Sequence, residues 1–126
     1  MFGGKCSADA VTAGVFRIVQ EIQRKRPTAK IVLNSILPRG SPGTSVFDDM
    51  PAYKEIRRLN QRLNCYASST VAIDFFNATD LFLAGPNATL VKDLYNDGVD
   101  GVHPSPAGYE VWTQSVVAKV MELTAD

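Results

Sequence analysis

Two short apolar runs separated by a helical pattern constrain the fold of this chain more than any other feature. The first, Ile31 to Leu37, lies in "AKIVLNSILP", and the second, Thr70 to Phe76, reads "TVAIDFF". Nearly continuous apolar runs of this length are typical of strands in a parallel sheet, because helices cover both faces of such a sheet. The order helix, strand, helix, strand, loop and helix therefore predicts an α/β fold with right-handed crossovers.

Three helices are expected around these strands. The first begins after Ser7 and ends near Arg26, where a proline follows, and the second starts near residues 51–52 and ends in "YASS". The third begins at Ser105 and Pro106, which suit the N-cap and the first helical position. Apolar residues at helical spacing predict one inward face for each helix. These residues are Val11, Val15, Ile18, Val19 and Ile22; Ile56, Leu59 and Leu63; and Tyr109, Trp112, Val116, Val120 and Leu123.

The number of strands sets a second expectation. Residues 77–96 are mixed in character and predict only a short helix or turn around Leu90 to Leu94. Open parallel sheets normally carry more than two strands. We therefore expect residues 1–126 to form a single domain that corresponds to the second half of a larger doubly wound fold, incomplete at its amino end.

Composition excludes several classes of partner. Thirteen basic and thirteen acidic residues cancel, so neither a nucleic acid nor an anionic membrane surface is expected to bind. No apolar run is long enough to span a bilayer. Cys6 and Cys65 lack the close spacing of metal ligands, and free thiols are favoured over a disulfide between them. Two "NAT" sequons, at Asn77 and Asn87, matter only in a secreted protein.

The stretch "DGVHPSPAGYEVW" holds His103, the only histidine of the chain. Asp100 lies three residues upstream, where its carboxylate could accept the Nδ1–H of the imidazole and leave Nε2 free as a general base. The pair lies on a loop before a helix, near the expected carboxyl ends of the strands, where open α/β sheets bind ligands. On spacing alone, a surface histidine beside a turn-forming aspartate is the favoured interpretation, because D-x-x-H is a common coincidence, and a metal site has little support.

The same stretch resembles the final block of the SGNH (GDSL-type) esterases and lipases. In that family, a D-x-x-H-P motif opens the last helix and supplies the aspartate and histidine of the catalytic triad. Upstream, "RPTAKIVLNSILPRG", "IRRLNQRL" and "VAIDFF" are similar to the corresponding strands and helix of the branch related to the platelet-activating-factor acetylhydrolase catalytic subunits. The resemblance runs from about Ala8 to Leu123. It implies a flavodoxin-like three-layer α/β/α sandwich, with Asp100 as the orienting carboxylate, His103 as the general base and Asp97 as a rival acid.

The family's nucleophile has no counterpart in this sequence. The resemblance implies a serine in a Gly-Asp-Ser block near the amino end and an oxyanion hole that includes a glycine and an asparagine, and none of these can be matched. Ser35, Ser41, Ser45 and Ser105 are poor substitutes, because none lies on a tight strand-to-helix turn. "MFGGKCSADAV" resembles residues that follow the asparagine block, so Met1 is expected to be an internal methionine of a longer protein.

Two functions follow as hypotheses. The first is a carboxyl-ester hydrolase for a small acyl ester, without a cofactor or a metal, that is close to inactive as this chain alone. The second is a non-catalytic binding or assembly module derived from the same fold. An open strand edge would also favour self-association.

Overall fold

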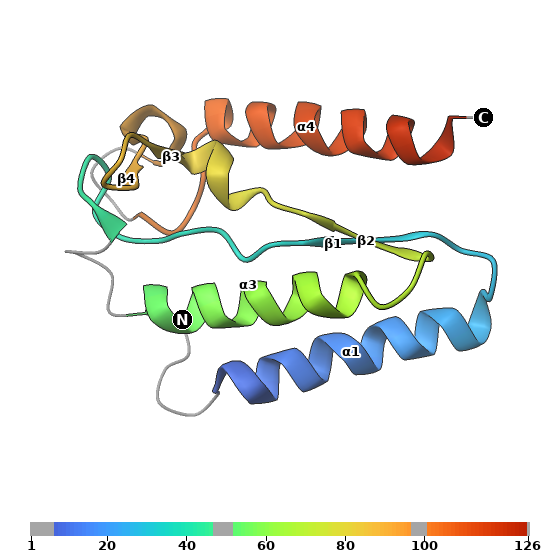
Figure 1. Cartoon of the computed structure of the whole chain (residues 1–126). Helices are drawn as coiled ribbons and strands as arrows, with labels where there is room; N and C mark the ends of the chain where they lie inside the picture. Colours follow the sequence, from blue (N-terminus) through green and yellow to red (C-terminus); the bar gives the residue numbers. More distant parts are fainter. Residues whose placement is uncertain (1–6, 47–51, 97–100, 126) are drawn as a thin grey trace.

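The computed structural model describes residues 7–46, 52–96 and 101–125, and the structural statements below concern these ranges. Three layers are visible in Figure 1. A parallel sheet of β1 (Ile31–Asn34) and β2 (Ile73–Phe76) forms the middle layer. Helices α1 (Ala8–Lys25) and α3 (Tyr53–Ala67) cover one face, and α4 (Pro106–Thr124) lies along the other. The α/β class and the parallel sheet predicted from the sequence are confirmed.

The main core lies between the sheet and the α1–α3 layer. Ile31 and Leu33 of β1 stand beside Ile73 and Phe75 of β2, because side chains two residues apart share one face of a strand. Against this face pack the buried residues of the two helices, which are Ala8, Val19, Leu59, Leu63 and Ala67. The inward face predicted for the second helix is confirmed, since Ile56, Leu59 and Leu63 are each at most 1% exposed.

Both strands are shorter than the apolar runs that predicted them. At the end of β1, the backbone of Ile36 turns from β2 to α3, where the Asn60 side chain accepts from the Ile36 N–H at 2.7 Å and donates to the Ile36 carbonyl at 3.0 Å. Before β2, the backbone N–H of Thr70 bonds Ala67 in a turn, and Val71 is 98% exposed. A side-chain amide and a turn thus complete the backbone hydrogen bonds that a longer ladder would have made.

A second apolar cluster stabilises the loops at the carboxyl end of the sheet. It buries Val46, Ile56, Phe82, Leu90 and Tyr95, with Trp112 of α4 packed at its margin. Short elements build it, namely η1 (Thr79–Phe82), β3 (Leu83–Ala84), β4 (Thr89–Leu90) and η2 (Lys92–Leu94). The short helix expected around Leu90 to Leu94 is present as η2, whereas the β3–β4 hairpin is too short to leave a periodic pattern.

Helix α4 buries its predicted inward face only in part, with Trp112, Val116 and Leu123 half-buried. Tyr109 is 48% and Val120 is 42% exposed, and Gly108 is the one buried residue of the helix. Polar contacts also attach α4 to the sheet. The Trp112 Nε1–H donates to Asn34 Oδ1 at 3.2 Å, and Lys119 Nζ lies 3.9 Å from Asp74 Oδ1. Two described strands are too narrow to cover the whole apolar stripe of α4.

Helix α1 shows the same partial burial. Val19 is buried, but Ile18 is 62% and Ile22 is 38% exposed. The five-residue stripe predicted for this helix is therefore only partly buried.

Candidate functional site

Residues 101–105, called the His103 loop below, are held by backbone hydrogen bonds on both sides of His103. The Asn96 N–H donates to the His103 carbonyl at 3.1 Å, and the Ser105 N–H donates to the Leu94 carbonyl at 2.9 Å. Tyr95 and Pro104 form an antiparallel bridge between these two bonds. The backbone of His103 is thus fixed against the segment that precedes the loop, while its side chain is exposed.

The N-terminus of α4 fixes the other end of this loop. The Ser105 hydroxyl accepts from the Gly108 N–H at 3.2 Å and donates to the Asp93 carbonyl at 2.7 Å. A Cβ atom at Gly108 would lie 2.2 Å from the Leu94 carbonyl oxygen, so this close approach requires glycine. The capping role predicted for Ser105 is confirmed, and its hydroxyl serves that role.

A second loop meets the His103 loop from the end of β1. The Gly40 N–H donates to the Gly101 carbonyl at 3.1 Å, and a Cβ atom at Gly101 would lie 1.3 Å from the Gly40 oxygen. Figure 1 shows that the loops after β1 and β2 leave the sheet at the end where α4 begins. The His103 loop therefore lies at the carboxyl end of the parallel strands, the edge where α/β folds bind ligands.

The buried side chain of Tyr95 also connects the same two loops. Its ring is 1% exposed and packs edge-on against Phe82, with ring centroids 5.5 Å apart. Its hydroxyl donates to the Pro38 carbonyl, two residues before Gly40. Burial raises the pKa of the Tyr95 hydroxyl well above its usual range, so it remains a neutral donor.

The acid predicted to orient His103 cannot be compared with this geometry. Asp100 and its rival Asp97 both lie outside the described residues, as does Cys6. The pairing of Asp100 with His103 stays a prediction. Cys65 is an exposed free thiol.

The serines considered as replacement nucleophiles occupy different surroundings. Ser35 is 4% exposed, and its hydroxyl lies 2.9 Å from Thr79 Oγ1 while accepting from the Thr79 N–H. Ser45 donates to the Asn87 carbonyl at 2.6 Å. Ser41 is exposed on the loop after β1. Ser35 and Ser45 therefore serve the packing of loops, and Ser105 caps α4.

Within the described ranges, no helix is both long and apolar enough to cross a bilayer. No three metal-ligating His, Cys, Asp or Glu side chains gather in those ranges. The sequence did not predict a polar cavity that lies beside α3. Polar residues at helical spacing on that helix could have indicated it.

Comparisons with known proteins agree with this architecture. No protein-family model matches the chain. The bovine (Bos taurus) platelet-activating factor acetylhydrolase IB subunit alpha1 is 27% identical over 103 residues, which make up 82% of this chain and 40% of the bovine protein.

Solved structures share the fold at lower identity. A GDSL-like lipase from Bacteroides thetaiotaomicron superposes with a TM-score of 0.71 at 22% identity, over 95% of this chain and 55% of the lipase. The esterase domain of the zebrafish ZfL2-1 ORF1 protein gives a TM-score of 0.69 at 20% identity, over 94% of this chain and 62% of that domain. The chain thus spans about half the length of these relatives. Taken together, the sequence likeness and the shared fold relate it to the SGNH/GDSL-like esterase family of platelet-activating factor acetylhydrolase.

Proposed function

We propose that this chain carries the acid–base pair of an ester hydrolase, with His103 as the general base and Asp100 as the carboxylate that orients it. One observation supports the proposal most. The His103 loop is fixed at the carboxyl end of the sheet by the Gly40–Gly101 and Asn96–His103 backbone hydrogen bonds, at 3.1 Å each. A general base needs such a fixed backbone, because proton transfer requires hydrogen-bond reach to the nucleophile.

The chemistry follows from these roles. The Nε2 atom of His103 takes the proton of a serine hydroxyl as the serine oxygen attacks the ester carbonyl. Collapse of the tetrahedral intermediate breaks the bond to the alcohol, which leaves with that proton from His103. Water then attacks the acyl-enzyme with the same proton transfers, releases the carboxylic acid and restores the serine. The Asp100 carboxylate accepts the Nδ1–H and stabilises the imidazolium that forms in each step.

We assign the nucleophile to a segment outside residues 1–126, because these residues contain no Gly-Asp-Ser block. Loss of the nucleophile from a triad lowers turnover by about a million-fold. We therefore expect the 126-residue chain alone to hydrolyse a short-chain aryl acetate close to the background rate.

The test compares this chain with a form extended by the upstream coding sequence. We expect ester hydrolysis only in the extended form, and loss of that activity in His103→Ala. Gln114→Ala, on the exposed surface of α4, is the control variant and should keep full activity. Activity of the short chain that disappears on His103→Ala would show that a serine within it is the nucleophile.

The role of Asp100 needs a separate measurement, which the 126-residue chain allows because His103 is its only histidine. Imidazole ¹⁵N chemical shifts report which ring nitrogen carries the proton. If Asp100 accepts the Nδ1–H, Asp100→Asn shifts the neutral ring toward the Nε2–H form, while Asp97→Asn leaves the spectrum unchanged. A larger effect of Asp97→Asn would make Asp97 the orienting acid.

A second function, that of a binding or assembly module, is favoured by the apolar side chains on the surface. Ile18 is 62% and Met121 is 66% exposed, on opposite outer layers of the fold. An inert extended form that remains folded would favour this alternative.

A further inference from the structure

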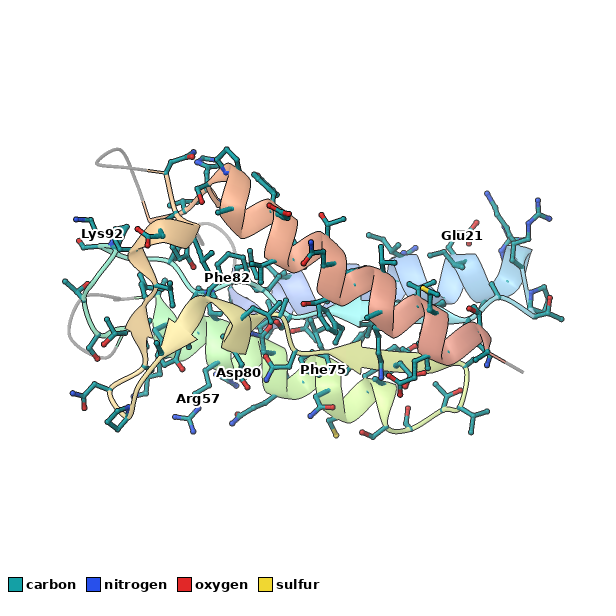
Figure 2. All side chains as sticks on the ribbon, turned by 90° about the horizontal axis from the view of Figure 1, so that it is seen from above. Glu21, Arg57, Phe75, Asp80, Phe82 and Lys92 are labelled. Carbon is teal, nitrogen blue, oxygen red and sulfur yellow. The ribbon has the colours of Figure 1, made fainter. Side chains whose placement is uncertain are left out.

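A polar cavity of about 250 Å³ lies beside the open edge of β2, between α3 and the start of η1. Its walls include Arg57, Gln61 and Asn64 on one side and Asn77 and Asp80 on the other, with Phe75 between them. Figure 2 shows Arg57, Phe75 and Asp80 on the same side of the molecule, coming from α3, β2 and η1. The residues that line this cavity do not include His103 or its described neighbours, so the cavity is separate from the proposed esterase site.

The α3 wall presents hydrogen-bonding groups that are not used in the fold. Arg57, Gln61 and Asn64 follow one another at spacings of four and three residues, so their side chains share one face of the helix. Within the described ranges, none of these three side chains has a hydrogen-bond or ion-pair partner. They offer the guanidinium donors of Arg57, and amide donors and acceptors from Gln61 and Asn64.

The opposite wall supplies mainly acceptors. The Asn77 Nδ2 donates to Asp80 Oδ2 at 2.9 Å, which orients both side chains. The Asp80 Oδ1 and the Asn77 Oδ1 remain as acceptors. The half-buried ring of Phe75 provides an apolar surface between the two walls.

The charges and the volume of the cavity limit the class of ligand that it can bind. The cavity has one cation, Arg57, and one anion, Asp80, so a simple anion would meet the carboxylate and a simple cation the guanidinium. A neutral hydroxyl group both donates and accepts, and therefore suits both walls. The volume corresponds to about eight water molecules at roughly 30 Å³ each, which is less than drug-sized pockets enclose.

We infer that this cavity binds a small, neutral, polyhydroxylated molecule of the size of one sugar ring. The ring's C–H face contacts Phe75, and its hydroxyls bond Gln61 and Asn64 on one side and Asp80 on the other. Because the walls are exposed and little apolar surface is buried, the affinity is expected in the millimolar range.

The test is a titration followed by NMR with the 126-residue chain, using methyl β-glucopyranoside and myo-inositol as probes. We expect saturable shifts of the side-chain NH₂ signals of Gln61, Asn64 and Asn77, while those of Gln114 on α4 do not move. Inorganic phosphate and glycine should not move these signals. The inference would be overturned if the chemical shifts of these NH₂ signals stayed unchanged up to about 100 mM polyol, or if phosphate or glycine shifted them equally.

Two matched variants separate binding from general effects. Gln61→Ala should weaken polyol binding about fivefold, as the loss of one hydrogen bond predicts, whereas Gln114→Ala should leave it unchanged. Both glutamines are exposed on helices, so neither change disturbs the fold. Equal affinity in the two variants would place the polyol elsewhere and contradict the proposed site.

Discussion

At the scale of single residues, the two loops of the candidate site meet through atoms that leave no room for a side chain. Gly101 is buried, and its position allows the Gly40 N–H to reach its carbonyl. What requires glycine there is a contact with a residue far away in the sequence, which no local pattern reports.

We predict that Gly101→Ala destabilises the chain by about 1–3 kcal/mol, because the added Cβ forces the two backbones apart and strains a buried hydrogen bond. Gly14→Ala is the matched control. Gly14 lies on the exposed surface of α1 with nothing within 4 Å of an added Cβ, so this change should stabilise by about 0.5–1 kcal/mol. Urea denaturation of both variants measures the free energies of unfolding. If Gly101→Ala left the free energy of unfolding unchanged, the two loops would not be in contact in solution.

At the scale of the elements, the sequence predicted the order of helices and strands correctly because their apolar patterns are local. It misjudged where the strands end, since the Asn60 amide takes over the hydrogen bonds of Ile36. It also predicted inward faces for α1 and α4 that are only partly buried, because periodicity identifies an apolar stripe without showing how wide a sheet lies opposite. The site loop was predicted from a motif, whereas its contact with Gly40 was not.

Asn60 gives a test at this scale. Asn60→Ala leaves the half-buried N–H of Ile36 without its acceptor, whereas the Ile36 carbonyl still accepts from the Thr79 hydroxyl at 3.1 Å, so we expect a loss of about 1–3 kcal/mol in the free energy of unfolding. Asn64→Ala changes the same residue type one turn later, where the side chain is exposed, and should stay within about 0.5 kcal/mol of the parent chain. Similar losses in both variants would mean that the Asn60 bonds contribute nothing specific.

At the scale of the whole molecule, burial of Tyr95 links stability to alkaline pH. The pKa of the Tyr95 hydroxyl is raised in the folded chain, whereas in the unfolded chain tyrosine ionises near its ordinary pKa of about 10. Unfolding therefore releases a proton above that pH. The stability that Tyr95 contributes is fully present below pH of about 10 and is lost as the pH rises, by up to about 1.4 kcal/mol per pH unit.

We expect Tyr95→Phe to unfold more easily at neutral pH by about 1 kcal/mol, because its hydroxyl no longer bonds the Pro38 carbonyl. Above pH of about 10 the variant should lose stability less steeply than the parent chain, so the two curves converge. Tyr109→Phe, at a half-exposed position on α4, serves as the control and should keep the parent slope. Parallel curves for Tyr95→Phe and the parent chain would contradict a buried, neutral Tyr95.

The meeting of the two loops has a consequence for the order in which the site forms during folding. Pro38 and Tyr95 are 57 residues apart in sequence, and the hydrogen bond between them joins the two loops that form the candidate site. Contacts between such distant residues form late, because closing the intervening chain costs entropy. The candidate site is thus a product of completed folding, and hydrogen–deuterium exchange at the Gly40 amide, whose proton bonds Gly101, reports directly whether it has assembled.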